Sequence, residues 1–184
     1  MAEYNVNNGG TDLSQVDNTP LKKAIEAMRA NYSDETRNEV VTKAVFDSTF
    51  FVPAQFDNTT ELMTDENDRL EFNERPKAQF ILIESPDGDK FIPAFTSHDG
   101  VIAFREEQKI PCEAFLMTFA DIVGVLESQS YLQGFVVDPS GYNLPFPTPF
   151  VMAIKQKLVE EMDRIENQQA QEGRSDITMT TKES

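Results

Sequence analysis

The chain has 184 residues, of which 32 are Asp or Glu and 16 are Lys or Arg, so its formal net charge is −16. Such a surface repels phosphate backbones and anionic lipid headgroups, which makes nucleic acids and membranes poor partners. Because Cys112 is the single cysteine, an internal disulfide and any multi-cysteine metal site are excluded. Because His98 is the single histidine, most histidine-based metal sites and catalytic triads are excluded as well.

The composition predicts one folded domain between two polar ends. Residues 1–17 are rich in Asn and Gly and predict a disordered arm, and residues 171–184 predict a disordered tail. We expect the single domain to span residues 18–170. No basic segment followed by an apolar run stands at the beginning of the chain, and no apolar run approaches the roughly 20 residues of a membrane helix. We therefore expect a soluble, cytoplasmic protein.

Two helices are predicted at the beginning of the domain. Thr19 as N-cap and Pro20 in the first turn form a start signal, and an apolar stripe follows at helical spacing (Leu21, Ala24, Ile25 and Met28). Ser33 predicts the N-cap of a second helix, which begins at about Asp34. The second helix is expected to bury Val40, Val41, Ala44 and Val45.

The middle of the chain changes to a β pattern. Thr49-Phe50-Phe51-Val52 predicts a strand that ends at Pro53, and the polar residues 57–76 leave room for a short strand at Arg69–Asn73. The apolar run Phe80-Ile81-Leu82-Ile83 predicts a strand that is covered on both faces. Ser85–Asp89 predicts a turn, after which Phe91–Phe95 returns as the partner strand, with Pro93 at a free edge or at the strand end.

The second half of the chain predicts alternating helices and strands. Ser97 is expected to cap a short helix that contains Val101, Ile102 and Phe104, and Ala114–Met117 is expected to be a strand. Thr118 and Asp121 resemble a capping box for a helix that buries Phe119, Ile122, Val123 and Leu126. Gly134–Asp138 predicts a strand that stops at Pro139-Ser140-Gly141.

A long last helix is predicted from Thr148-Pro149. Its apolar stripe consists of Phe150, Val151, Ile154, Leu158, Met162 and Ile165, and Glu160 and Arg164 are expected to form an ion pair. The fold class is therefore α/β (α+β): a mixed sheet of about five strands with helices packed on it, two N-terminal helices and a long C-terminal helix. Two interpretations of Tyr142–Pro147 remain open, an exposed aromatic contact patch or a packed connection.

Residue types that support catalysis or metal binding do not gather in the sequence. His98 lies between Ser97 and Asp99, but three consecutive side chains point in different directions and cannot form a triad. The acidic stretch Asp65–Glu71 fails the pattern of a calcium loop, because Arg69 stands where a third oxygen ligand belongs and Leu70 stands where the turn needs Gly. No Lys or Arg occurs in residues 111–147 to stabilise a thiolate, so Cys112 is expected to be a buried hydrophobe. We therefore expect no enzymatic activity, no cofactor and no metal.

Three motifs in chain order resemble the SseB N-terminal domain family (enhanced serine sensitivity protein B). Phe50-Phe51-Val52-Pro53 is similar to the strand ending in Val-Pro near the start of that family, and Phe91–Ser97 resembles its "LPvFTs" element. Gly134–Gly141 resembles its "gvviNP.g" element, with Asp138 where the family usually has Asn. The resemblance spans residues 20–165. It implies an α/β domain without an established enzymatic activity, and we expect the second domain that some members carry to be absent.

The leading hypothesis is a non-enzymatic, cytoplasmic interaction or accessory module. Its acidic surface would select an unidentified protein partner with a basic surface. The expected contact residues lie where two strands end, at Phe95, Thr96, Ser97, Asp138, Pro139 and Gly141. The alternative is a small-molecule sensor or weak hydrolase with a polar pocket lined by Thr96, Ser97, His98 and Asp138. We expect a monomer or a weak homodimer, because Pro93 disfavours pairing through its strand.

Overall fold

The computed structural model describes residues 16–56, 62–64, 70–72 and 78–175, with side chains for residues 16–55 and 79–169. The chain divides into two units, Met1–Thr148 and Pro149–Ser184, and each is described by itself. Residues 1–15 of the expected arm and residues 176–184 of the expected tail lie outside the described residues. Residues 16 and 17 are described and lead into the first helix, and the last helix continues to Ser175.

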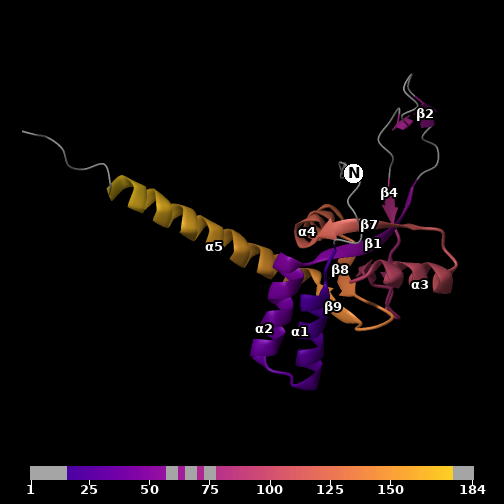
Figure 1. Cartoon of the computed structure of the whole chain (residues 1–184), viewed down its shortest axis with the longest axis horizontal. Coiled ribbons are helices and arrows are strands. Elements are labelled where there is room, and N and C mark those ends of the chain that lie inside the picture. Colours follow the sequence, from indigo (N-terminus) through magenta and orange to yellow (C-terminus); the bar gives the residue numbers. More distant parts are fainter. Residues whose placement is uncertain (1–15, 57–61, 65–69, 73–77, 176–184) are drawn as a thin grey trace, which may run out of the picture. The chain divides into compact units, whose positions relative to one another are not determined.

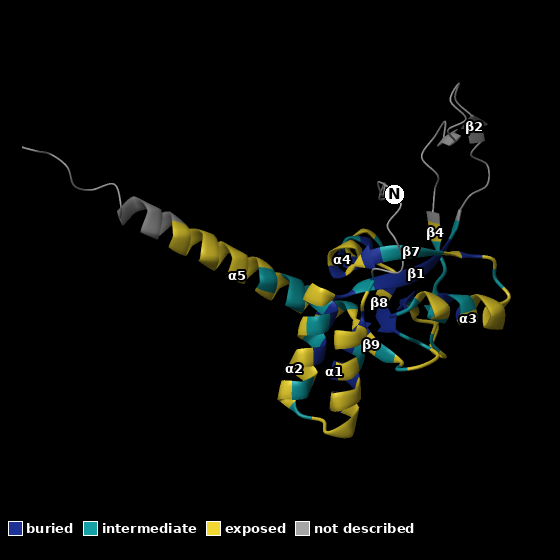
Figure 2. Ribbon diagram, in the orientation of Figure 1, coloured by how far each residue is buried: buried dark blue, intermediate teal, exposed yellow. Residues whose placement is uncertain are grey.

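The mixed α/β fold class is confirmed, with more and shorter strands than expected. In chain order the elements are α1 (Thr19–Ala30), α2 (Asp34–Thr42), η2 (Lys43–Asp47), β1 (Thr49–Phe56), β2 (Leu62–Thr64), β3 (Leu70–Phe72), β4 (Ala78–Phe80), β5 (Ile83–Glu84), β6 (Lys90–Ala94), α3 (His98–Gln108), β7 (Glu113–Thr118), α4 (Phe119–Ser128), β8 (Leu132–Val137), β9 (Leu144–Pro147) and α5 (Thr148–Ser175) (Figure 1). Within the described part, the strand orders are β4-β1-β7, β2-β3 and β5-β6-β8-β9. Buried residues concentrate in β1 and β8, with exposed residues on the outer faces of the helices (Figure 2).

The two N-terminal helices form as predicted, with one correction at each. The N-cap position of α1 is Asn18 rather than Thr19, and the Thr19 N–H donates to Asp17 Oδ1 at 2.9 Å. The predicted apolar stripe of α1 is buried throughout. Of the four residues expected to be buried in the second helix, Val40 and Ala44 are buried, and Val41 and Val45 are half-buried. From Lys43 the chain widens into the π-helical turn η2, whose extra residue per turn shifts Val45 away from the predicted stripe.

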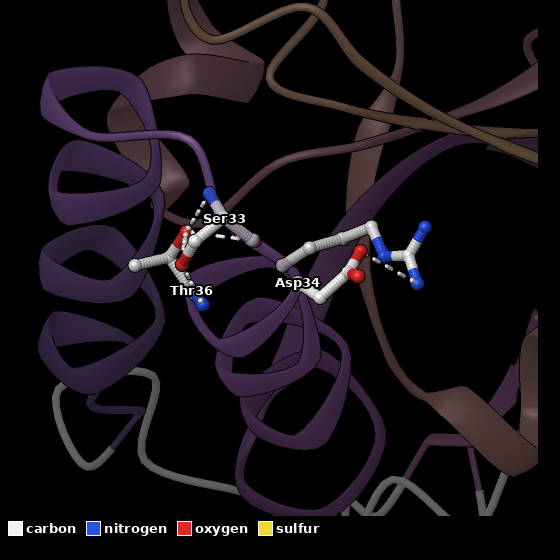
Figure 3. A network of polar contacts seen from close by, with 4 residues as sticks. Ser33, Asp34 and Thr36 are labelled. Carbon is white, nitrogen blue, oxygen red and sulfur yellow. Dashed lines mark hydrogen bonds and ion pairs between the residues drawn. The ribbon is translucent and has the colours of Figure 1, made fainter.

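Ser33 caps α2 through a reciprocal pair of hydrogen bonds, which Figure 3 shows from close by. The Ser33 hydroxyl oxygen accepts the Thr36 N–H at 3.1 Å, and the Thr36 hydroxyl oxygen accepts the Ser33 N–H at 2.9 Å. Asp34 and Arg37 add an exposed ion pair at 3.5 Å. The cap satisfies backbone donors that a helix end would otherwise leave open, so α2 begins where the sequence predicts.

Two buried prolines face each other where two sheets meet. Phe51 and Phe95 form a single antiparallel bridge, in which each N–H donates to the other's carbonyl at 2.9 Å. Two residues further along, this register sets Pro53 opposite Pro93, and neither residue has an N–H to donate. The ladder between β1 and β6 therefore stops after one bridge, and the Pro53 carbonyl instead accepts the Ile81 N–H at 2.9 Å.

This seam corrects three sequence predictions. The first strand does not end at Pro53, because β1 continues to Phe56 and pairs with β7 on its other edge. Of the two alternatives for Pro93, the free edge is wrong, because Pro93 is buried and pairs with Val136 of the parallel strand β8. The strand end is close to what is observed, because β6 ends one residue later at Ala94. The run Phe80–Ile83 is not one strand covered on both faces: β4 pairs with β1, β5 pairs with β6, and the half-buried residues between them cross from one sheet to the other.

The predicted turn at Ser85–Asp89 closes the hairpin between β5 and β6. The Ser85 N–H donates to the Asp89 carbonyl at 2.8 Å, and Gly88 adopts φ +88°, which only glycine reaches without strain. The short strand expected at Arg69–Asn73 is present as the backbone strand β3, paired with β2. The rest of residues 57–76 lies outside the described part.

The strand β9 was not expected from the sequence, and it settles the two interpretations of Tyr142–Pro147. β9 pairs antiparallel with β8 at the edge of its sheet, where prolines are tolerated. Phe146 is buried and stacks on Phe135, with ring centroids 4.7 Å apart. A Cβ on Gly134 (φ +147°) would lie 2.2 Å from the Phe146 carbonyl oxygen, so only glycine fits there. The segment is a packed connection.

The later elements begin at the predicted caps. The Ser97 hydroxyl accepts the Gly100 N–H at the start of α3, and Thr118 and Asp121 form a capping box at the start of α4. The predicted apolar face of α4 is buried, with Val125 added. Cys112 is buried in a cluster with Phe51, Phe95, Val101 and Phe104, as the sequence predicts.

In α5, Val151 is buried, but much of the predicted stripe is exposed. The expected ion pair between Glu160 and Arg164 is wrong: Arg164 pairs with Glu161, and Glu160 accepts from Gln156. Among the described residues, no helix is long and apolar enough to cross a membrane.

Candidate functional site

The parallel pairing of β6 with β8 brings the predicted contact residues to one edge of the sheet. Ala94 lies opposite Val137, so the residues that follow both strands leave the sheet side by side. The Asp138 N–H continues the ladder by donating to the Ala94 carbonyl at 3.0 Å. The sequence prediction that Thr96 and Asp138 come together is therefore met by the geometry of the strands that precede them.

Both carboxylate oxygens of Asp138 are engaged by Thr96. The Thr96 N–H donates to Oδ1 at 2.8 Å, and the Thr96 hydroxyl donates to Oδ2 at 2.6 Å. Thr96 is 4 % exposed, and Asp138 is half-buried. We refer to this pair as the Thr96–Asp138 clamp. It fastens the end of β6 to the end of β8 with two charge-assisted hydrogen bonds, which are the stronger kind.

The backbone conformation of Asp138 explains the residue type at this position. Its φ is +44°, in the left-handed region where Asp and Asn are better tolerated than other non-glycine residues. Its carbonyl accepts the N–H groups of Gly141 and Asn143, both at 2.8 Å. A short polar side chain is thus required twice, once for the turn conformation and once for the clamp.

Asn18 is a further member of the cluster that sequence reasoning missed. Its side-chain amide donates to the Thr49 carbonyl and to the Thr96 carbonyl, both at 2.9 Å, and the residue is 4 % exposed. Its Oδ1 is buried without a hydrogen-bond partner among the described groups. The start of α1, the start of β1 and the end of β6 therefore meet at one side chain. The only signal in the sequence is an asparagine directly before the Thr19-Pro20 helix start, and asparagine is a favoured N-cap residue.

The turn after β8 is tied to α1 by Tyr142. Its hydroxyl donates to Glu26 Oε1 at 3.0 Å, and the Arg29 guanidinium lies over its ring, 5.2 Å from the centroid, while donating to the Tyr142 carbonyl. Burial, reinforced by the hydrogen bond to Glu26, raises the pKa of the Tyr142 hydroxyl. On the other side of the turn, Ser140 donates to Glu107 of α3 at 3.3 Å. The turn is therefore anchored to two helices.

The six predicted contact residues differ in how accessible they are. Phe95 and Thr96 are buried, Ser97, Asp138 and Pro139 are half-buried, and only Gly141 is exposed. Phe95 packs against Phe104, with ring centroids 5.4 Å apart. The exposed groups at this edge are instead their neighbours: His98, Asp99, Ser140 and, at the far end of α3, Glu107.

The polar groups considered for a catalytic or sensing pocket are engaged in holding the fold. The Thr96 hydroxyl bonds Asp138, and the Ser97 hydroxyl caps α3. His98 is exposed at the first position of α3, and its ring centroid lies 5.9 Å from that of Phe51. In the part of the chain that the structure describes, no three His, Cys, Asp or Glu side chains gather in a way that could hold a metal ion. The thiol of Cys112 is buried, and burial raises its pKa, which opposes thiolate chemistry.

Comparison with known proteins gives one match. The family model described as SseB protein N-terminal domain matches residues 21–153. This match includes all three sequence motifs, both prolines of the seam and the Thr96–Asp138 clamp. No curated protein and no solved structure matches the chain.

Proposed function

The chain belongs to the SseB N-terminal domain family, and we propose that it is a non-enzymatic, cytoplasmic protein-interaction module. The proposed contact surface is the exposed edge around the Thr96–Asp138 clamp. It consists of Asp99 and Glu107 on α3 and of Ser140 and Gly141 in the turn after β8. We call it the clamp face. Its proposed partner is a protein with a basic surface.

One observation supports the proposal: the polar groups of the Thr96–Asp138 clamp hydrogen-bond each other and hold the two strand ends together, so they do not present a reactive group to solvent. Both oxygens of Asp138 accept hydrogen bonds from Thr96, and the turn that follows is fastened to α1 and α3. A surface that is held in one conformation before binding loses little conformational entropy when a partner binds. This is the property that an interaction surface built from turns requires.

The negative charge of the chain indicates that the proposed partner has a basic surface. The chain has a net charge of −16, and Asp99 and Glu107 add exposed carboxylates to the clamp face. Acidic surfaces accelerate association with basic partners and disfavour acidic ones, and salt weakens both effects. The small-molecule or hydrolase alternative has less support, because the hydroxyls of Thr96 and Ser97 and the Asp138 carboxylate already have partners within the fold.

The test compares two variants that make the same change at different places. Asp99→Lys reverses a charge in the first turn of α3, and Glu35→Lys reverses one in the first turn of α2. Both residues are exposed, and both variants change the net charge equally. The full chain and each variant are immobilised, and proteins retained from a lysate of the source cell at low and at high salt are identified by mass spectrometry.

The proposal expects a specific protein that wild type and Glu35→Lys retain at low salt and release at high salt, and that Asp99→Lys does not retain. Equal loss in both variants would mean that overall charge alone attracts the protein, and it would refute the clamp face. Retention of nothing specific by the wild-type chain would refute the interaction module.

A further inference from the structure

Strand β7 (Glu113–Thr118) is the last strand of its sheet, in which the order is β4-β1-β7 (Figure 1). Phe51 of β1 lies opposite Leu116, but its N–H and carbonyl both bond Phe95 on the far side of β1. In an antiparallel ladder, two opposite residues point their backbone groups either toward each other or away from each other. The N–H and carbonyl of Leu116 therefore point away from β1, and those of Ala114, two residues earlier, do the same.

We call the side of β7 that faces away from β1 its outer edge. In the part of the chain that the structure describes, the backbone groups of Ala114 and Leu116 on this edge have no hydrogen-bond partner. Both side chains pack against the buried cluster around Cys112, and Phe115 on the opposite face contacts the ring of Phe80 at a centroid distance of 6.4 Å. The two faces of β7 thus serve its own fold, and a partner would bind to the backbone along the outer edge.

The other outer strands of the described sheets are protected against pairing with another chain, and β7 is not. β9 carries Pro145 and Pro147, β2, β3 and β4 have three residues each, and β5 has two. Prolines and short strands are usual protections of a sheet edge, as are lysines and β-bulges. β7 has six residues, contains no proline or lysine, and pairs with β1 without a register shift. Its outer edge is therefore able to pair.

The composition of β7 indicates which kind of strand fits this edge. Glu113 is the only charged residue of the strand, and residues 114–120 contain none. A basic partner would find little charge to bind here, whereas an uncharged apolar strand of the same length would fit. β7 of a second copy is such a strand. In a chain with a net charge of −16, this edge is also a place where two copies meet with little charge between them.

We propose that the outer edge of β7 is a self-association site, which pairs antiparallel with β7 of a second copy across a two-fold axis at Phe115. In this register, Ala114 of each copy lies opposite Leu116 of the other, and the two residues exchange both of their backbone hydrogen bonds. A small side chain thus lies beside a large one. Glu113 lies opposite Met117, so the two glutamates are about 14 Å apart along the strands, beyond a Debye length of about 8 Å.

The pair is weak, and salt affects it in a direction that identifies it. Each copy contributes one short strand, so the buried area is below that of standard stable interfaces, and we expect a dissociation constant on the order of 10–100 µM. Because both copies are strongly acidic, added salt screens their repulsion and should strengthen the pair. Salt should instead weaken the binding of a basic partner to the clamp face. The inference does not depend on the clamp face, and either proposal can fail alone.

Sedimentation equilibrium of the full chain measures the association at low and at high salt, over concentrations up to about ten times the expected dissociation constant. Ala114→Pro removes an N–H of the outer edge and breaks no bond to β1, because this N–H points away from β1. Ala114→Ser is the matched control, since it keeps the N–H. We expect dimers for wild type and Ala114→Ser, tighter at high salt, and at least a roughly tenfold weaker association for Ala114→Pro. Circular dichroism checks that both variants fold.

Amide hydrogen exchange followed by NMR tests the proposal without any substitution, so it also decides the matter if Ala114→Pro does not fold. The wild-type chain is compared at concentrations below and above the dissociation constant. The amides of Ala114 and Leu116 should exchange rapidly in the dilute chain and become protected in the concentrated one. The amides of Phe115 and Met117, which face β1, should be protected in both.

Three results would overturn the proposal. The first is a wild-type chain that remains monomeric at the highest concentration at both salts, or a dimer that a folded Ala114→Pro variant leaves intact. The second is a dimer in which the amides of Ala114 and Leu116 stay unprotected, because the copies would then meet elsewhere. The third is protection of these amides already in the dilute chain, because a segment of the same chain would then occupy the outer edge.

Discussion

Removing the Asp138 side chain tests the physical role of the clamp. Asp138→Ala deletes both acceptors that Thr96 uses, at 2.8 Å from its N–H and 2.6 Å from its hydroxyl. Thr96 is only 4 % exposed, so water replaces these acceptors poorly. Each hydrogen bond to a charged acceptor contributes about 1.5 kcal/mol at a half-buried carboxylate. Alanine at φ +44° adds about 1 kcal/mol relative to aspartate.

The expected loss is therefore about 4 kcal/mol of the free energy of unfolding, a large part of the roughly 5–15 kcal/mol that domains possess. Asp138→Asn is the matched control. Its amide oxygen still accepts the Thr96 N–H, the Thr96 hydroxyl can rotate to accept from the amide nitrogen, and asparagine tolerates the left-handed conformation. We expect asparagine to cost no more than about 1 kcal/mol.

Urea denaturation followed by far-UV circular dichroism measures both variants. Tryptophan fluorescence is not available, because the chain contains no tryptophan. An alanine variant within about 1 kcal/mol of wild type would refute the clamp as a stabilising contact. An asparagine variant as unstable as the alanine variant would refute the explanation by geometry and assign the effect to charge.

Four further predictions concern the packing around the site. Gly134→Ala should cost more than about 3 kcal/mol or prevent folding, because its Cβ would lie 2.2 Å from the Phe146 carbonyl oxygen; a near-normal urea midpoint would contradict the described β8–β9 pairing. Ser97→Ala should cost about 1 kcal/mol in the same assay through loss of the α3 cap, and a cost near zero would show that the cap is not used. The Cys112 thiol should react with an aromatic disulfide at neutral pH only when urea opens the fold, and rapid labelling of the native chain would contradict its burial. Burial raises the pKa of the Cys112 thiol in the folded chain, so the unfolded chain loses this proton at lower pH. The free energy of unfolding should therefore decrease as the pH rises through the ordinary thiol range. Cys112→Ala should remove the contribution of this thiol to that decrease.

Local signals carried most of what the sequence predicted. The caps at Ser33, Ser97 and Thr118 and the glycine turn at Gly88 depend on a few neighbouring residues, and all four are confirmed. The convergence of Thr96 and Asp138 was also predictable, because both follow strands that end in the same sheet.

Non-local pairing accounts for what the sequence could not predict. Pro53 and Pro93 each suggest a strand end when considered alone, and only the Phe51–Phe95 bridge shows that they face each other across a seam inside the fold. Asn18 was missed for the same reason: its two acceptors lie 31 and 78 residues away in the sequence. The exact register between distant strands decides these contacts, and no local pattern contains it.

Hydrogen exchange on the clamp face tests the central claim most directly. The full chain is exchanged alone and with the protein that it retains at low salt, and protection is compared by peptide. The account predicts new protection in the first turn of α3, around Asp99, and in the turn at residues 139–142, with no change in the first turn of α2. Protection confined to other surfaces, with both of these segments unchanged, would contradict the proposal that the clamp holds an interaction surface.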